Sequence, residues 1–412
     1  MKLLLAPLML LSASSHAFFK PIPESENTQT LVPNAREITS VLQIQSLGLN
    51  SGATGIDLWS GSYWPQFQGL LANRYLDPEF AALMSSEAQY KAFSELAKKK
   101  PTYSYRDVNY LSPAEKYDLV VGDESMSLTK YSWEIGEKTA KLSGKVPVWR
   151  GICDGWAAAS QMMPRPERAV TMTSPRGVPV TFFPEDIKAI GSLSYARSQK
   201  DPIFLGKRCL SGALFFTDAC DETNPGAFHK ALVNRVGRMK KSFVADVSPG
   251  SEVWNYPVKN YKFTYYNILT QEDAADVRDA LEVFDAKDSK KKFKRKDRRD
   301  KRTRYIVGVV AEVNYADMRH ATNAVDKILT KTYDYDLELD ANLNILGGES
   351  VSKDLPDFIW APNDTTYPTA EVEAGGMPRN DYELMLKAKE ASKDGQPLSI
   401  IVKKLFENSR AL

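Results

Sequence analysis

Residues 149–159 read WRGICDGWAAA and place one cysteine, Cys153, directly before a run of alanines. Asp154 and Gly155 suit the start of a helix, and the segment that follows favours helix until Pro164. Alanine side chains are small enough to let this helix pack closely beneath a sheet. The N-terminus of a helix carries partial positive charge, which favours a thiolate over a thiol. We therefore expect Cys153 to be activated.

Cys153 has four candidate roles: structural thiol, half of a disulfide, metal ligand or nucleophile. The chain has three cysteines, and Cys209 and Cys220 bracket a short loop, CLSGALFFTDAC, that lets them bridge. We predict a disulfide between these two and a free Cys153, either a buried inert thiol or a nucleophile. The scattered cysteines and histidines match no usual zinc-ligand spacing, which disfavours a metal at Cys153.

The first 17 residues predict a secretory signal. Lys2 supplies a positive charge, residues 3–11 are apolar, and Ser15-His16-Ala17 forms a small-x-small cleavage site. The apolar run is too short to span a bilayer, so we expect no membrane span. The mature chain is expected to start at Phe18 and to be secreted or periplasmic.

The composition is that of a globular protein. Hydrophobic residues make up 43% and aromatic residues 10%, and the net charge of +2 gives no indication of nucleic-acid or membrane binding. Residues 287–304 hold twelve basic and three acidic residues. We predict a solvated basic loop there, with a polyanion site or an exposed supply of lysines as the alternative. Phe293 is its one aromatic residue, so base stacking is poorly supported and no nucleic-acid partner is expected.

The order of elements predicts an α+β fold with an antiparallel sheet, because helices come first and strands later. One helix, at 272–284, is expected to interrupt the strands. The other predicted helices span 34–48, 86–99, 112–122, 154–163 and 184–193, a hairpin spans 170–183, and the predicted strands span 227–236, 241–247, 260–268, 304–315, 331–340 and 343–348.

His229 and His320 are the two histidines that remain after signal removal. A hairpin that turns at Gly237-Arg238 would place His229 opposite Asp246, with Cβ atoms about 4.5–5.5 Å apart. The carboxylate would then orient the imidazole, and the imidazole would accept the proton of Cys153. A structural ion pair between His229 and Asp246 is the alternative.

Five segments of the chain resemble one family. They are WRGICDGWA, the paired cysteines in KRC and AC, NPGAFHKALVNRVG, FVADV and, most specifically, VWNYPVKNYKF at 253–263. Over residues 59–360 the chain resembles the secreted transglutaminase elicitor family of oomycete plant pathogens and marine bacteria. The chain departs from the family pattern at Tyr256, where glutamine is expected, and at Asn260, where glycine is expected.

This resemblance implies a papain/transglutaminase-like core, with the nucleophile at a helix N-terminus packed on an antiparallel sheet. It implies γ-glutamyl transfer from protein glutamine to an amine, usually lysine, so the expected partners are protein substrates. Carried over, Cys153 is the nucleophile, His229 the base and Asp246 the orienting carboxylate. A second possible triad shares the cysteine and uses Asp317 and His320.

Three tryptophans, Trp149, Trp156 and Trp254, are candidates for the wall of a partly dry site. An indole N–H, with Trp149 as our choice, would complete an oxyanion hole with the backbone N–H of Cys153. A papain-like protease has glutamine six residues before the cysteine, where this chain has Pro147. That difference weakens a protease interpretation.

Calcium is a possible cofactor by resemblance. Residues 340–344, DANLN, begin like a calcium loop but lack the glycine at position six and the acidic residue at position twelve, so we predict a turn there.

We divide the chain into a signal at 1–17, an N-terminal segment at 18–55, a transglutaminase-like domain at 56–362 and a C-terminal tail with a helix at 363–412. Two other functions stay open. One is a papain-like cysteine hydrolase, either protease or glutamine deamidase, and the other is a non-enzymatic surface interaction protein.

Overall fold

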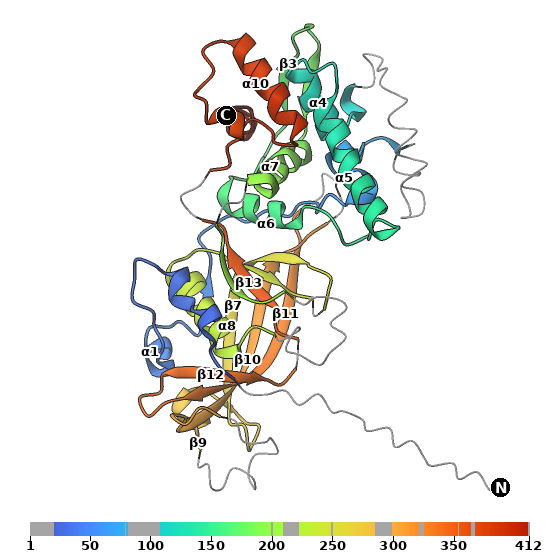
Figure 1. Cartoon of the computed structure of the whole chain (residues 1–412). Helices are drawn as coiled ribbons and strands as arrows, with labels where there is room; N and C mark the ends of the chain where they lie inside the picture. The colour runs from blue at the N-terminus through green and yellow to red at the C-terminus, as the bar shows by residue number, and fades with distance from the viewer. Residues whose placement is uncertain are drawn as a thin grey trace, which may run out of the picture.

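The computed structural model has a helical layer at one end and a large antiparallel sheet at the other, with the first turn of α6 (Cys153–Met162) near their boundary (Figure 1). The structure describes residues 20–78, 80, 108–198, 201–208, 222–248, 250–284, 299–319, 321, 325–352, 354–363 and 367–410.

The helical layer is built on apolar packing around α6. Its helix α4 begins with the predicted capping box, in which Ser112 and Glu115 satisfy each other's backbone N–H groups at 3.2 and 2.8 Å. Trp156 and the three alanines that follow it are fully buried in this core. The other helices of the layer are α4 (Pro113–Val120), α5 (Ser127–Ser143), α7 (Pro184–Ser198), α10 (Asp381–Lys393) and α11 (Ser399–Asn408), and the predicted hairpin is β3 (Val170–Thr173) with β4 (Pro179–Phe182).

The sheet is antiparallel in every described pairing, in the order β1-β12-β11-β10-β7-β6-β13-β5. Every second residue along much of its long central strands is apolar or tyrosine and faces a second core, which explains why the strand pattern is visible in the sequence. The strands are β1 (Lys20–Pro21), β2 (Ser51–Ala53), β5 (Ile203–Gly206), β6 (Val244–Asp246), β7 (Asn255–Tyr266), β8 (Asp273–Ala274), β9 (Glu282–Val283), β10 (Tyr305–Ala316), β11 (Ile328–Leu339), β12 (Ile345–Ser350) and β13 (Phe358–Ala361).

Helix α8 (Pro225–Ala231) and the π-helical turn Leu232–Arg238 lie where a strand was predicted. The prediction of a strand at 227–236 is wrong. Asn224 caps the helix by accepting the Gly226 N–H at 2.9 Å, Pro225 occupies the first turn, and every residue of α8 is buried. A helix buried all round shows no apolar stripe, so its periodicity is lost.

Residues 272–284 were predicted as a helix, and this prediction is also wrong. They form β8, a 3₁₀ turn at Val277–Ala280 and β9. The two short strands pair with β7 and β10, so backbone pairing to the sheet overrides the local helix propensity. The helix predicted at 34–48 is limited to α1 (Val41–Ser46), and the one at 86–99 lies outside the described residues.

Both ends of the described chain pack onto the rest of the molecule. β1 pairs with β12 and β2 pairs with β7, while side chains of α11 such as Leu405 and Phe406 lie in the core that contains α6. The remaining short 3₁₀ helices are at Glu24–Glu26, Thr28–Leu31, Gln66–Gln68, Leu70–Ala72, Val108–Tyr110 and Glu371–Glu373.

Candidate active site

Cys153 is the first residue of α6, as the sequence predicts, and it is a free thiol. The backbone leading to it is fixed because the Ile152 N–H donates to the Tyr63 carbonyl at 2.7 Å. The cysteine is only 6% exposed. It therefore sits at the bottom of a site and not on an open surface.

Asn255, the first residue of β7, contacts the thiol directly. Its Nδ2 donates to Cys153 Sγ at 3.4 Å, and the thiol lies 3.7 Å from the Val253 carbonyl. The Trp360 indole N–H donates to Asn255 Oδ1 at 2.8 Å, which turns the amide N–H₂ toward the sulfur. The spacing of residues in the sequence gives no signal for this trio, because Cys153, Asn255 and Trp360 come together only through the sheet.

Burial raises the pKa of the Cys153 thiol to about 11. The nearby carboxylates of Asp154 and Asp246 also raise it, while the hydrogen bonds from Asn255 lower it. The expectation of an activated thiol in the free protein is wrong. Cys153 does lie at a helix N-terminus, which favours a lower thiol pKa, but desolvation has the larger effect and raises the pKa.

Asp246 lies at the end of β6, where it pairs with Asn255. Its Oδ1 accepts the Trp254 N–H at 2.9 Å, while Oδ2 is buried and has no hydrogen-bond partner among the described residues. Burial raises the pKa of this carboxyl to about 7. The structure thus brings Asp246 to the same site as Cys153, through a strand pairing different from the predicted one.

His229 is not brought to Cys153, and the predicted hairpin register is wrong. His229 lies on α8 with 0% exposure, stacks on Phe263 at 4.0 Å and shares a hydrogen bond with the Tyr335 hydroxyl at 3.0 Å. Phe263 is eight positions beyond Asn255 on β7, about 26 Å along the strand at about 3.3 Å per residue. Burial lowers the pKa of His229 to about 3, so it is neutral and enclosed.

The three predicted wall tryptophans have different environments. Trp156 is fully buried and its indole N–H donates to the Trp59 carbonyl at 3.2 Å. The Trp254 indole N–H donates to Glu252 at 3.0 Å. Trp149 lines the pocket beside Cys153, and its indole N–H has no hydrogen bond to any described residue.

The pocket in front of Cys153 has a volume of about 430 Å³. Asn255 and Trp360 line it, together with the aromatic rings of Phe204 and Phe358. Residues that the sequence did not single out, Gln66, Arg150 and Arg208, complete it. A pocket of this volume with mixed polar and apolar walls lies within the range typical of ligand-binding sites.

The β10–β11 connection carries the second predicted pair, Asp317 and His320. Burial raises the pKa of Asp317. Asp317 and Cys153 both act electrostatically on Tyr256 and raise its pKa, so both lie near that residue. Met318 bridges to Gly61, and Gly61 packs so closely on the Trp156 ring that an added Cβ would lie 2.6 Å from it. His320 lies outside the described residues.

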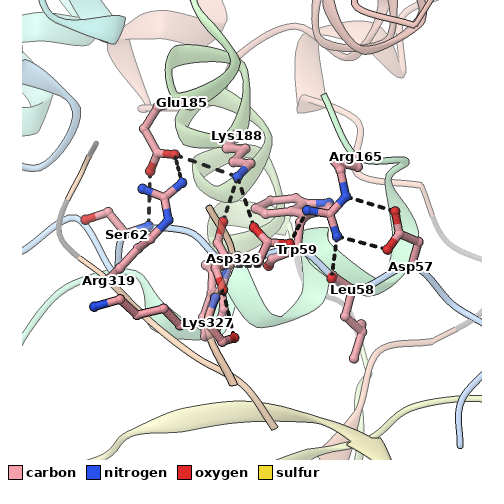
Figure 2. Close-up of polar contacts among 12 residues, drawn as sticks. Asp57, Leu58, Trp59, Ser62, Arg165, Glu185, Lys188, Arg319, Asp326 and Lys327 are labelled. Carbon is pink, nitrogen blue, oxygen red and sulfur yellow. Dashed lines mark hydrogen bonds and ion pairs between the residues drawn. The ribbon is translucent and has the colours of Figure 1, made fainter. Parts of the chain in front are cut away.

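A buried polar network holds this connection against the helices (Figure 2). Arg319 pairs with Glu185 of α7 at 2.8 Å, and its backbone N–H donates to the Gly61 carbonyl at 3.1 Å. At the other end, Asp326 pairs with Arg165 and lies 3.9 Å from Lys188. The Arg319–Glu185 pair is buried, and such a pair fixes position more than it adds stability, whereas Arg165 and Asp326 are partly exposed.

A second set of contacts reinforces the network. Lys188 donates to the Ser60 carbonyl at 2.7 Å, and Ser60 exchanges hydrogen bonds with the backbone of Lys327 at 2.9 and 3.1 Å. Arg165 also forms a double contact with Asp57 at 2.9 Å (Figure 2). The chain from 57 to 62 therefore links α7 and the β10–β11 connection, and the next residue, Tyr63, accepts the N–H of Ile152 just before Cys153.

The residues at 340–344 do not fit a calcium site. They form the predicted turn between β11 and β12, and the Asp340 carboxylate already accepts from the Asn342 and Asn344 N–H groups at 2.8 Å each. Among the described residues no cluster of three or more metal-ligating side chains occurs. No helix in that part of the chain is long and apolar enough to cross a membrane.

Two predicted features lie outside the described residues. These are the Cys209–Cys220 disulfide and most of the basic loop at 287–304. The described end of the loop is anchored, because Arg299 pairs with Glu338 at 3.1 Å.

The fold is similar to that of the GP42 transglutaminase from Phytophthora sojae. The TM-score is 0.59 and the sequence identity 20%, over 94% of this chain and 97% of that chain. At this identity the likeness establishes a mixed helical and antiparallel-sheet fold. The comparison with curated proteins gave no match. The family model for transglutaminase elicitor matches residues 38–391, and the chain belongs to that family.

The contact between Asn255 and the thiol gives a testable prediction. Replacing Asn255 by alanine should slow alkylation of Cys153 by iodoacetamide at pH 8 by about 10-fold or more. A hydrogen bond to a charged group contributes about 1.5–3 kcal/mol, so its loss raises the thiol pKa by about 1–2 units. Labelling is measured at Cys153 by peptide mass spectrometry.

Two further variants make this experiment specific. Trp360→Phe removes the N–H that orients Asn255 and should slow labelling less. Asn260→Ala removes a second asparagine of β7, whose Oδ1 accepts from Asn314, and should leave the rate unchanged. Equal rates in Asn255→Ala and the wild type would show that the amide does not stabilise the thiolate.

Proposed function

We propose that this protein is a protein-glutamine γ-glutamyltransferase that forms a thioester at Cys153. The observation that carries the proposal is a free thiol at the start of α6, facing an oriented Asn255 amide and a pocket of about 430 Å³, in a transglutaminase elicitor family member. The substrates are proteins that carry glutamine and lysine.

The reaction has two half-reactions. The Cys153 thiol loses its proton to a base, and the sulfur attacks the glutamine carboxamide carbon to form a C–S bond. The C–N bond then breaks, and the amide nitrogen takes the proton and leaves as ammonia. In the second half, an amine attacks the thioester, the new C–N bond forms, the C–S bond breaks and the sulfur regains a proton.

The base is proposed to come from the β10–β11 connection, with His320 as the proton acceptor and Asp317 as its carboxylate. This choice is supported by the described neighbours, since Met318 and Arg319 are bound to Gly61, which packs on Trp156 of α6. His229, with its pKa lowered to about 3 and its position on α8, is unsuited to the task. Asp246 acts as the second carboxyl beside the thiol.

The oxyanion of the tetrahedral intermediate needs hydrogen-bond donors beside Cys153. The backbone N–H of Cys153, at the first position of α6, and the indole N–H of Trp149 are the proposed donors. Asn255 Nδ2 adds a third, because it already points at the sulfur. Gln66 is a further candidate donor, because its side chain lines the pocket. Its Oε1 accepts from Thr139 at 2.8 Å, so the donor to the oxyanion would be its Nε2.

Transfer competes with hydrolysis of the thioester, and the same site supports a deamidase or protease as the second candidate. The aromatic rings of Trp149, Phe204, Phe358 and Trp360 favour transfer, because they limit water at the thioester. The basic loop would serve the third candidate, a non-enzymatic surface protein, whereas most of the segment 253–263 is strand β7, which is paired with β10 on one edge and with β6 and β2 on the other.

One assay separates these functions. Casein is incubated with a fluorescent primary amine, and amine incorporation, ammonia release and peptide cleavage are followed together. A transglutaminase gives incorporation with equal ammonia, a deamidase gives ammonia alone, and a protease gives fragments. If none of these products forms, the enzyme proposal is wrong, and the surface interaction protein is the remaining candidate.

Export is proposed from residues 1–17, with a secreted or periplasmic location. N-terminal sequencing of protein recovered from the medium or periplasm should start at Phe18. Protein that stays in the cytoplasm with Met1 retained would contradict it.

A further inference from the structure

Two arginines flank Trp149 at the mouth of the pocket. The Arg150 guanidinium lies 5.6 Å from the Trp149 ring centre and that of Arg208 lies 5.9 Å from it. They come from separate segments, one just before α6 and the other just after β5. Both are exposed, and neither forms an ion pair with a described carboxylate. The pocket lining therefore carries two exposed positive charges, both close to the ring of Trp149.

The carboxyl groups near these arginines are buried deeper. Asp154 and Asp246 lie at the inner end beside Cys153, and burial raises the pKa of both, that of Asp246 to about 7. With a pKa of about 7, Asp246 carries less negative charge near neutral pH than an exposed carboxylate would. Arg208 acts electrostatically on Asp246, while neither arginine at the mouth forms an ion pair with a described carboxylate.

We propose that the acyl-donor glutamine is taken from acidic segments of protein, with carboxylates next to the glutamine binding Arg150 and Arg208. This inference rests on the proposed function and names its substrate class. A guanidinium binds a carboxylate with two parallel N–H···O bonds, and the Trp149 ring, over which both guanidiniums lie, keeps the two charges close together beside the pocket. The amine acceptor is a lysine cation, which these arginines repel, so it reaches the thioester from another side.

The test uses three glutamine peptides that differ only in the residues flanking the glutamine: glutamate, alanine or lysine. Ammonia release is measured, because transfer and hydrolysis both produce it. We expect kcat/KM to fall in the order glutamate, alanine, lysine. Two exposed ion pairs of up to about 1 kcal/mol each make the glutamate peptide about 3- to 30-fold better than the alanine peptide. The preference should shrink in 0.5 M salt, since salt screens exposed charges.

Charge reversal sharpens the experiment. In the double variant Arg150→Glu, Arg208→Glu, the order should invert, with the lysine-flanked peptide preferred. Arg176→Glu, on the turn between β3 and β4, is the matched control, because Arg176 is also an exposed arginine and lies outside the pocket lining. Its order should match that of the wild type.

The outcomes are distinguishable from failure of the proposed function. Equal kcat/KM for all three peptides in the wild type, or an order that does not change in the double variant, overturns the acidic-donor proposal and leaves the glutaminyl activity standing. Absence of ammonia from every peptide and from casein overturns both.

Discussion

Cys153→Ala should abolish amine incorporation and ammonia release, with a loss of at least about 10⁴-fold in kcat. The sulfur forms the bond that replaces the amide C–N bond, so no other group of the site can take its place. Cys153→Ser should be nearly as inactive, because a hydroxyl in this buried site is a far weaker nucleophile than a thiol. The measurement is incorporation of a fluorescent amine into casein.

The control for this prediction is Ser160→Ala on the same helix. Ser160 is buried and donates to the Ala157 carbonyl at 3.1 Å, so its loss tests the effect of a buried substitution in α6. Its activity should stay within about 3-fold of the wild type, and the thermal midpoint of Cys153→Ala should stay within about 4 °C. Substantial turnover by Cys153→Ala would show that Cys153 is not the nucleophile.

The second large effect is expected at one histidine and not at the other. His320→Ala should lower kcat by about 10³- to 10⁴-fold, because the thiol of pKa about 11 then has no proton acceptor. His229→Phe should stay active, since phenylalanine preserves the stack on Phe263 and loses only the Tyr335 contact. Activity is measured with the casein assay under identical conditions.

The acid stability of His229→Phe supplies an independent readout. Burial lowers the native pKa of His229 to about 3 from its usual 6.5, so below pH 6.5 the unfolded chain binds a proton that the native chain refuses. The wild type should therefore lose stability as the pH falls from 6.5 to about 3, and His229→Phe should lose less. An inactive His229→Phe with an active His320→Ala would restore His229 as the base.

Much of the fold is visible in the sequence because its elements follow local rules. The capping box at Ser112, the helix start at Cys153 and the alternating strands β7, β10 and β11 were all predicted from patterns of a few residues. The error at α8 has a physical cause, since burial on all sides removes the helical stripe. The pair Asn224-Pro225 was the available signal, because together they form a typical helix start.

The site was harder to predict, because it depends on contacts across the chain. Asp246 was found for the wrong reason, since its partner in the sheet is Asn255 and not His229. Asn255 and Trp360 carry no motif of their own, and their roles appear only when β7 and β13 meet the start of α6. Burial, which reverses the expected pKa shift of Cys153, is likewise a property of the folded chain.

The high pKa of Cys153 also governs how the thiol behaves when no substrate is bound. At neutral pH nearly all of this thiol stays protonated, and protonated thiols react slowly with disulfides and peroxides. Cys153 can thus remain unmodified in the presence of oxidants, because the burial that lowers its nucleophilicity in the free protein also protects it. The thiol then reacts only when a proton acceptor and a bound substrate are present together. Burial of Cys153 therefore both keeps the free enzyme unreactive and restricts its reaction to bound substrates.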